Sequence, residues 1–313
     1  MKAIQFFAIT ALGAALFASC SNQEELATGS YPSDNLIRVT AGVNNDMTRG
    51  DEATATALTQ NFSLTVVNNT NNNFSYANEI FSLNGTEWSC GKNLLWQNLT
   101  TAVKIVALYP ATAANTFSGV YSKESNTIGT ITYSVNSDQS KADDANNDLL
   151  LYHNASFKPE KDLQEGKLNI EFNHAFCRID IEVTIGTEFN ASTGLAENPI
   201  QGISVGGTQI AADISFSETA DPTFTATGDA TSITPTPGTF TSATSESEQA
   251  VAKYSCIVIP QTADLKVLLH TSDREFEWTG KQMELVSGKQ YTLQLNMTNK
   301  SATARKFILR ERK

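Results

Sequence analysis

The sequence predicts an all-β protein built from two tandem antiparallel β-sandwiches. Apolar residues recur with a period of two in short runs, and no stretch of the chain sustains a helical period. Thr, Ser and Asn are abundant, whereas charged residues make up only 18% of the chain. The 313 residues contain ten or more such runs. A single sandwich has about seven strands, so this number of runs indicates two sandwiches. The chain is also long enough to bury two cores.

Residues 1–19 have the pattern of a signal peptide. Lys2 precedes an apolar run from Phe6 to Ala18, which is too short to cross a bilayer as a helix. The run leads into Ser19-Cys20, and small residues before a cysteine are typical of a bacterial lipoprotein cleavage site. We therefore expect Cys20 to be the lipidated first residue of the mature chain. The alternative is ordinary cleavage, with Cys20 incidental.

Residues 20–34 are expected to form a polar tether next to the lipid. Glu24 and Glu25 follow Cys20 closely, and this arrangement is similar to the tag that exports lipoproteins of Bacteroidales to the outer face of the outer membrane. A solvated tether with no export role is the alternative. The prediction is a lipid-anchored outer-membrane protein that is exposed on the cell surface.

Beyond the tether, polar turn residues separate the predicted strands. These strands are the runs 36–43, 62–67, 103–109, 130–135, 168–172, 179–185, 210–216, 254–259, 265–270 and 291–297. Residues 218–249 contain few large apolar side chains. For them we expect a long surface loop or a poorly ordered hairpin.

A change in side-chain parity places the boundary between the two sandwiches. Apolar residues occupy even positions from Leu168 to Phe172 and odd positions from Ile179 to Ile185. A bulge or a change of sheet must therefore lie at residues 173–178. We predict an N-terminal sandwich over residues 35–178 and a C-terminal sandwich with a basic tail over residues 179–313.

The composition argues against several functions. A net charge of -11 and the lack of a basic, aromatic-interleaved patch exclude nucleic-acid binding. The histidines are widely spaced without metal-ligand partners, and none of the cysteines after Cys20 forms a C-x-x-C pair. These residues are His153, His174, His270, Cys90, Cys177 and Cys256. We expect no enzyme, cofactor or metal site, and at most one internal disulfide.

One motif is typical of a hydrolase. Gly202-Ile203-Ser204-Val205-Gly206 matches a nucleophile elbow, and Asp264 and His270 follow in the order of a catalytic triad. The elbow requires a strand that turns into a helix, but the residues that follow lead toward another strand. We therefore reject the triad.

Two further motifs are weak. Asp144, Asn146 and Asp148 have the first spacing of a calcium loop, but Leu149 and Ala155 stand where Gly and Glu are required. Arg49-Gly50-Asp51 matches a tripeptide that some integrins bind, and a match of three residues carries little information.

Aromatic residues leave a second function open. Trp88, Trp96 and Trp278 would form a sugar-stacking platform if they were exposed together, although single tryptophans in sandwiches usually fill cores. A surface glycan-binding lipoprotein is therefore the alternative function.

His174 lies in an apolar setting at the parity change, so we expect a hydrogen-bonded core imidazole rather than a ligand.

Several motifs, taken in order, resemble the fimbrillin family of Bacteroidales. They are the lipoprotein cleavage site before Cys20 (the lipobox), Met47-Thr48-Arg49-Gly50, Leu95-Trp96, and the segments 103–110, 148–152, 168–175, 257–261 and 285–293. The resemblance covers nearly the whole mature chain. It implies two β-sandwiches of the transthyretin-like, Greek-key kind. It also implies a structural or adhesive subunit of a type V pilus, whether stalk, tip, anchor or accessory.

The resemblance also implies assembly by strand exchange with other fimbrial subunits. In the family, trypsin-like cleavage after an Arg frees the first strand, and the matching residue here is Arg49. The alternative is an unprocessed loop residue. The candidate donor strand is the basic tail, with Phe307, Ile308 and Leu309 at its centre, and the alternative is a frayed terminus. Further expected partners are outer-membrane lipid, through Cys20, and host or bacterial surface ligands.

Overall fold

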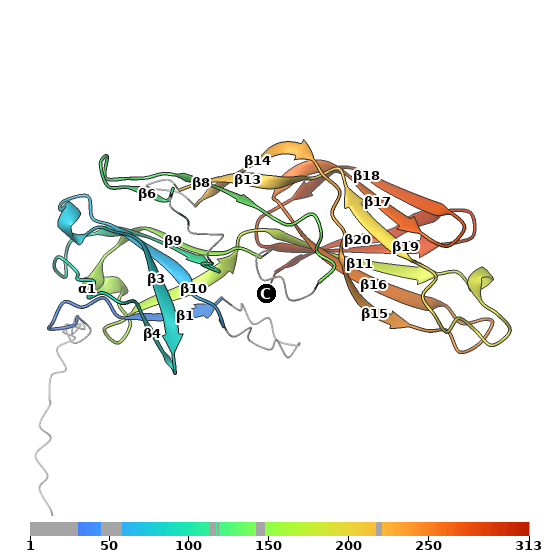
Figure 1. Cartoon of the computed structure of the whole chain (residues 1–313), viewed down its shortest axis with the longest axis horizontal. Coiled ribbons are helices and arrows are strands. Elements are labelled where there is room, and N and C mark those ends of the chain that lie inside the picture. Colours follow the sequence, from blue (N-terminus) through green and yellow to red (C-terminus); the bar gives the residue numbers. More distant parts are fainter. Residues whose placement is uncertain are drawn as a thin grey trace, which may run out of the picture.

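The computed structural model describes residues 31–44, 58–112, 117, 119–141, 148–216 and 221–312. The predicted signal peptide, Cys20, Arg49, Asp144 and Asn146 lie outside the described residues. The all-β prediction is confirmed. Within the described ranges the one α-helix is α1 (Pro159–Asp162), and two 3-10 turns, η1 (Asn72–Phe74) and η3 (Thr187–Phe189), accompany it. Figure 1 shows an elongated molecule with two units side by side.

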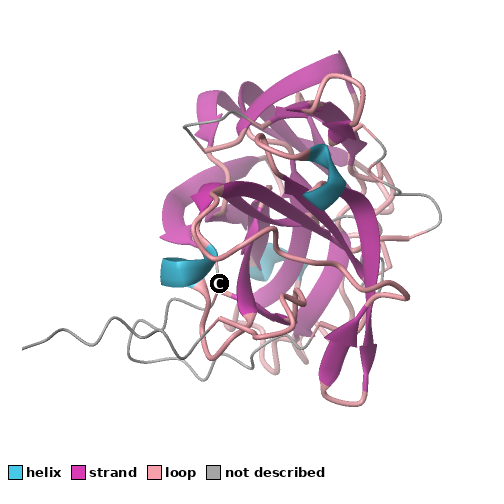
Figure 2. Ribbon diagram, turned by 90° about the vertical axis from the view of Figure 1, so that its left-hand side faces the viewer, coloured by secondary structure: helices cyan, strands magenta, loops and turns pink. Residues whose placement is uncertain are grey.

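The first unit is a sheet that closes on itself. Its strands are β1 (Val39–Val43), β2 (Phe62–Val67), β3 (Tyr76–Asn84), β4 (Glu87–Ser89), β5 (Val103–Tyr109), β9 (Leu150–Phe157) and β10 (Leu168–His174). They follow the order β1-β10-β9-β5-β2-β3-β4, and the pair Val39–Trp88 joins β1 to β4. Figure 2 looks onto this unit and shows its strands curving around a common interior. A closed sheet thus takes the place of the open sandwich that we expected.

The second unit has two main sheets. One contains β15 (Thr236–Thr241), β16 (Ala250–Val258), β11 (Cys177–Ile185), β19 (Lys289–Met297) and β20 (Ala302–Glu311). The other contains β12 (Gly202–Gly206), β17 (Gln261–His270) and β18 (Glu275–Leu285). Inward side chains of both sheets share one hydrophobic core. The expectation of purely antiparallel sheets is wrong at two places, because β1 runs parallel to β10 and β11 runs parallel to β19.

Two smaller sheets complete the described fold. β8 (Thr130–Ser134) pairs with β13 (Gln209–Ser215), which also pairs with β14 (Thr223–Ala230). β6 (Tyr121–Ser122) pairs with β7 (Thr127–Ile128). β8 precedes the predicted boundary at residue 178, yet its partner strand follows that boundary. The boundary stays a prediction, and the pairing of β8 does not respect it.

The expectation of a loop or poorly ordered hairpin at residues 218–249 is wrong, because this segment contributes β14 and β15. Phe224, Ala226 and Phe240 pack against the second core. Threonine fills many of the intervening positions, and a β-branched side chain favours extended backbone. Small and hydroxyl-rich strands of this kind have no strong apolar alternation, which is why the sequence indicated a loop.

The predicted change of sheet between Phe172 and Ile179 is confirmed. In β10 the even positions from Leu168 to Phe172 are buried, and in β11 the odd positions from Cys177 to Ile185 are buried. The two strands belong to different sheets. The intervening Ala175 and Phe176 are also buried, so the crossover itself is part of the core.

Strand β5 is buried along its whole length on both faces. Ile105 and Ala107 point into the first core, whereas Val106 and Leu108 point into the second core. Apart from Lys104, the residues of β5 form the apolar run that a strand covered on both faces requires. β5 therefore belongs to both cores and fixes one relative to the other.

We predict that Leu108→Ala lowers the free energy of unfolding by about 2–5 kcal/mol, because a Leu that is 1% exposed leaves a cavity. The matched control is Leu83→Ala, since Leu83 is 44% exposed and the change should stay within about 0.5 kcal/mol. Urea unfolding of both variants measures the difference. Equal losses for the two variants would contradict the burial of β5 between the cores.

Candidate functional site

The first candidate site is strand β1, the strand that the family resemblance implies to be removable. Along one edge it pairs with β10 through five residue pairs, from Val39–Leu168 to Val43–Phe172. Hydrogen bonds from Leu168 N to Arg38 O and from Asn44 N to Phe172 O, each 2.8 Å long, flank this ladder. β1 is thus firmly paired along this edge.

Along its other edge, and among the described residues, β1 has a single strand pair, Val39–Trp88 with β4. Beside this contact lies a groove of about 280 Å³, lined by residues of β1, by Phe81 and Trp88, and by Leu94. Of the strand pairs that close the sheet of the first unit, β1 and β4 therefore share the fewest paired residues.

β1 and the residues before it still contribute to the first core. Ile37 and Val39 are buried, and Ala41 and Val43 pack against the same core. Burial of an aliphatic side chain is worth about 1.5–3 kcal/mol, so these residues stabilise the unit by several kcal/mol. Withdrawal of β1 would expose the edge of β10 and open an apolar groove above Leu168, Ile170 and Phe172.

The second candidate site is strand β20, which contains the predicted donor residues. β20 lies at the edge of the five-stranded sheet, and its one strand partner within the described ranges is β19. Phe307 stacks on Tyr291 with ring centroids 5.2 Å apart, Ile308 is half-buried, and Leu309 is 55% exposed. The alternative of a frayed terminus is wrong, because the tail is an ordered edge strand.

A partly buried ionic cluster holds the end of β20 at the junction of the two units (Figure 1). Arg312 forms an ion pair with Asp148 and donates a second hydrogen bond to Phe176 O at 3.2 Å. His174 Nδ1 lies 3.0 Å from the same carboxylate oxygen of Asp148. His174 thus has a polar neighbour, as expected, but it is only partly buried and lies in an ionic setting rather than in an apolar core. We call Arg312, Asp148 and His174 the Arg312 cluster.

Electrostatics in the Arg312 cluster follow from burial and charge. Burial acts to raise the pKa of Asp148, but the Arg312 charge and the His174 hydrogen bond outweigh it and lower that pKa. Burial lowers the pKa of Arg312, although the Asp148 charge opposes this. Sequence analysis missed the pairing of Arg312 with Asp148, because 164 positions separate the two and no local pattern marks them.

The tryptophans do not form the sugar-stacking platform that we considered. Trp96 is 2% exposed and stacks on Phe157 at 5.5 Å. Trp88 packs against the first core, and Trp278 packs against the second core. The three rings therefore pack against hydrophobic cores and do not form one exposed surface.

The hydrolase motif forms ordinary sheet structure. Gly202–Gly206 is strand β12, and the chain turns at Gly207, with φ at +86°, directly into β13. A Cβ at Gly207 would lie 1.9 Å from Asp264 O, so only glycine fits this tight turn. Strand follows strand here, and no nucleophile elbow forms.

Other expected features are placed as follows. Cys90, Cys177 and Cys256 are free thiols, and burial raises the pKa of Cys177 and of Cys256 to about 12.

Among the described residues no three His, Cys, Asp or Glu side chains are grouped to hold a metal ion. No helix in that part of the chain has the length and apolar character needed to span a membrane.

Comparison with known proteins identifies relatives. A family model described as fimbrillin-like matches residues 38–307. No curated protein sequence matches the chain.

Three solved structures resemble the fold. A candidate cell adhesion protein from Bacteroides uniformis is 16% identical with a TM-score of 0.58, covering 89% of this chain and 99% of its own. A candidate cell adhesion protein from Bacteroides ovatus is 14% identical with a TM-score of 0.59, covering 89% and 98%. A fimbrial protein from Bacteroides vulgatus is 15% identical with a TM-score of 0.54, covering 88% and 99%. At these identities the likeness shows a shared fold.

We predict that Arg312→Ala lowers the free energy of unfolding by about 3 kcal/mol at pH 7, because it leaves the Asp148 carboxylate without its partner. Loss of one partner of a buried ion pair costs about 3–5 kcal/mol. We expect the lower value because the Asp148 side chain is 29% exposed. The pKa of Asp148 is lower in the folded state, so its contribution is present above its unfolded pKa of about 3.9 and is lost as the pH falls through the folded value. The loss of stability caused by Arg312→Ala should therefore become smaller as the pH falls below about 3.9.

Urea unfolding between pH 2 and pH 7 measures this dependence. The matched control is Arg310→Ala, an exposed Arg on the same strand, for which we expect a change within about 0.5 kcal/mol. A penalty for Arg312→Ala that does not vary with pH would contradict the ion pair.

Proposed function

Because the chain belongs to the fimbrillin-like family, we propose that it is a subunit of a type V surface pilus and assembles by exchange of β-strands. The family is structural and adhesive, not enzymatic. The observation that carries the proposal is the pairing of β1, which has five residue pairs along β10 and one along β4. Such a strand is replaceable by an incoming strand that uses the same edge of β10.

In this proposal the first unit is the acceptor. Cleavage after Arg49 disconnects β1 from the rest of the chain, and β1 then leaves the sheet. The edge of β10 then offers its free backbone groups to a strand of a second subunit, and the apolar groove takes alternate side chains of that strand. The gain from refilling the groove drives assembly.

The tail is the proposed donor. It combines Phe307, Ile308 and Leu309 with basic neighbours, and the acidic surface of a second subunit attracts these charges. To donate, the tail has to leave β19 and separate Arg312 from Asp148. The same contacts keep the tail in its own subunit until a vacant groove is present.

We also propose that Cys20 carries the lipid and that the chain is displayed at the outer membrane. Several acyl chains, at about 0.8 kcal/mol per buried methylene, anchor a protein of this size without a transmembrane helix. The polar tether of residues 20–34 then separates the first unit from the bilayer. Adhesion to host or bacterial surfaces is the corresponding role for the assembled pilus.

We predict that trypsin converts the full chain into a stable product that begins at Gly50 and forms larger assemblies. The reason is that cleavage releases β1 while β10 and the other strands keep their pairing. Intact-mass spectrometry identifies the product, and size-exclusion chromatography detects the assemblies. Arg49→Ala is the control and should remain uncut at this site and monomeric. Survival of the Arg49 bond in the wild type would rule out the processing step.

We predict that Leu309→Asp prevents assembly of the cleaved protein but leaves the subunit folded. Leu309 is 55% exposed in the free subunit, so the change should alter stability by no more than about 0.5 kcal/mol. In an acceptor groove the same residue would place a charge against apolar side chains.

The control for this variant is Leu99→Asp, because Leu99 is 43% exposed and lies outside the tail. Chromatography of both cleaved variants measures assembly. Wild-type assembly by Leu309→Asp would exclude the tail as donor.

A further inference from the structure

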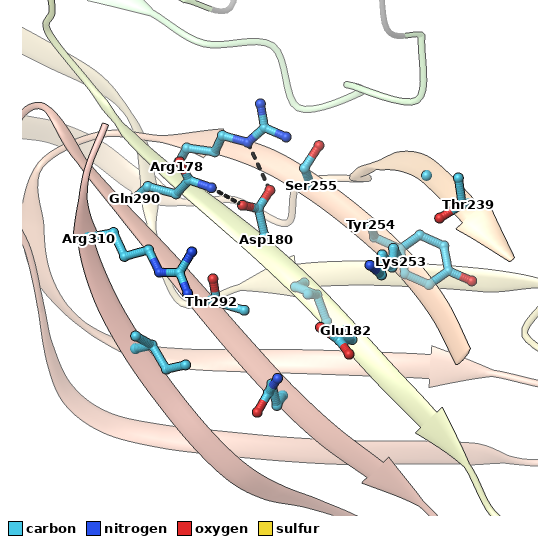
Figure 3. A pocket seen from close by; sticks show the side chains of 14 residues that line it. Arg178, Asp180, Glu182, Thr239, Lys253, Tyr254, Ser255, Gln290, Thr292 and Arg310 are labelled. Carbon is cyan, nitrogen blue, oxygen red and sulfur yellow. Dashed lines mark hydrogen bonds and ion pairs between the residues drawn. The ribbon is translucent and has the colours of Figure 1, made fainter. Parts of the chain in front are cut away.

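A polar groove of about 460 Å³ crosses the outer face of the five-stranded sheet (Figure 3). All five strands of that sheet contribute side chains to it, and nearly all of these are charged, amide or hydroxyl groups. We propose that this groove binds a carbohydrate that carries a carboxylate. This surface is different from β1. Ile308 and Arg310 belong to β20, so the groove is complete while β20 stays paired with β19 in its own subunit.

The centre of the groove is organised by Asp180 of β11. One carboxylate oxygen of Asp180 accepts a hydrogen bond from Arg178 Nε at 2.8 Å, and the other accepts one from the Gln290 side-chain amide. Both oxygens of Asp180 are therefore occupied. The two terminal nitrogens of Arg178 have no partner among the described residues and remain available to a ligand. A guanidinium that is held at Nε presents a fixed fork, which matches the two oxygens of a carboxylate.

The charge of the groove favours an anion. Its lining contains three cationic side chains, Arg178, Lys253 and Arg310, against two carboxylates, Asp180 and Glu182. Lys253 and Glu182 lie opposite each other in the ladder between β11 and β16. Arg310 has no side-chain partner within the described part of the chain. The groove is thus net positive on a chain with a net charge of -11, and this favours an anionic ligand here.

The remaining lining fits a sugar better than a peptide. The central strands β11, β16 and β19 are paired along both edges, so a peptide backbone finds no free ladder on this face. Recognition must come from side chains. Ser255, Thr292 and Gln294 each donate and accept hydrogen bonds, as sugar hydroxyls do, and Ile308 offers an apolar patch for the C–H face of a ring.

One rim of the groove is shaped by a bulge in β15. The register against β16 shifts between Pro237 and Phe240, and Gly238 and Thr239 line the groove there. A Cβ at Gly238 would lie 3.0 Å from Lys253 O. Glycine therefore allows the rim to approach β16 closely, which narrows this side of the groove.

The test is calorimetric titration of the purified full chain with an α-1,4-linked galacturonic acid trimer. We expect binding to the wild type and affinities at least tenfold lower for Arg178→Gln and for Arg310→Gln. The matched control is Arg274→Gln, which removes the same charge from an exposed turn outside the groove and should keep wild-type affinity. The thermal unfolding midpoint of each variant verifies that the sheet is intact.

Three further ligands make the outcome decisive. The methyl-esterified trimer keeps every hydroxyl but has no charge, and we expect at least tenfold weaker binding. Triglutamate and inorganic phosphate carry charge without the sugar rings, and we expect weaker binding for both. The proposal is overturned if the trimer does not bind, if the ester, triglutamate or phosphate binds as tightly as the trimer, or if Arg274→Gln weakens binding as much as the groove variants.

Discussion

The arrangement of the molecule depends on a strand that is buried on both faces. β5 supplies Ile105 to the first core and Val106 and Leu108 to the second, so neither core is complete without it. A strand in this position cannot rotate or slip, because a shift of one residue would exchange the two sets of side chains. The two units are consequently held by shared packing rather than by a flexible linker.

The crossover from β10 to β11 lies at the same junction. The parity of buried residues changes there, and Ala175 and Phe176 are buried between the two sheets. The Arg312 cluster adds a polar contact at this point and ties the end of the last strand to the crossover. The strand proposed to leave, β1, and the strand proposed to donate, β20, therefore flank a rigid centre. Exchange of either strand leaves β5 and the crossover in place.

Much of the fold could be predicted from the sequence, because burial imposes a period of two on most strands. The runs at 103–109, 168–172 and 179–185 all form strands, and the change of sheet follows from their parity. Three features could not be predicted. β14 and β15 have small polar side chains, β8 pairs across the expected boundary, and the parallel pairings join strands that are distant in sequence. The same distance concealed the pairing of Arg312 with Asp148. The proposed role of β1 could be inferred from the sequence, because a motif resembling a family's cleavage site follows this strand.

In the proposed assembly, β1 must be released before the chain forms fibres at the cell surface. Electron microscopy of cells that overproduce the wild-type chain or Arg49→Ala tests this requirement. We expect fibres on cells with the wild-type chain and none on cells with Arg49→Ala at equal surface abundance. Equal numbers of fibres on both kinds of cell would contradict it.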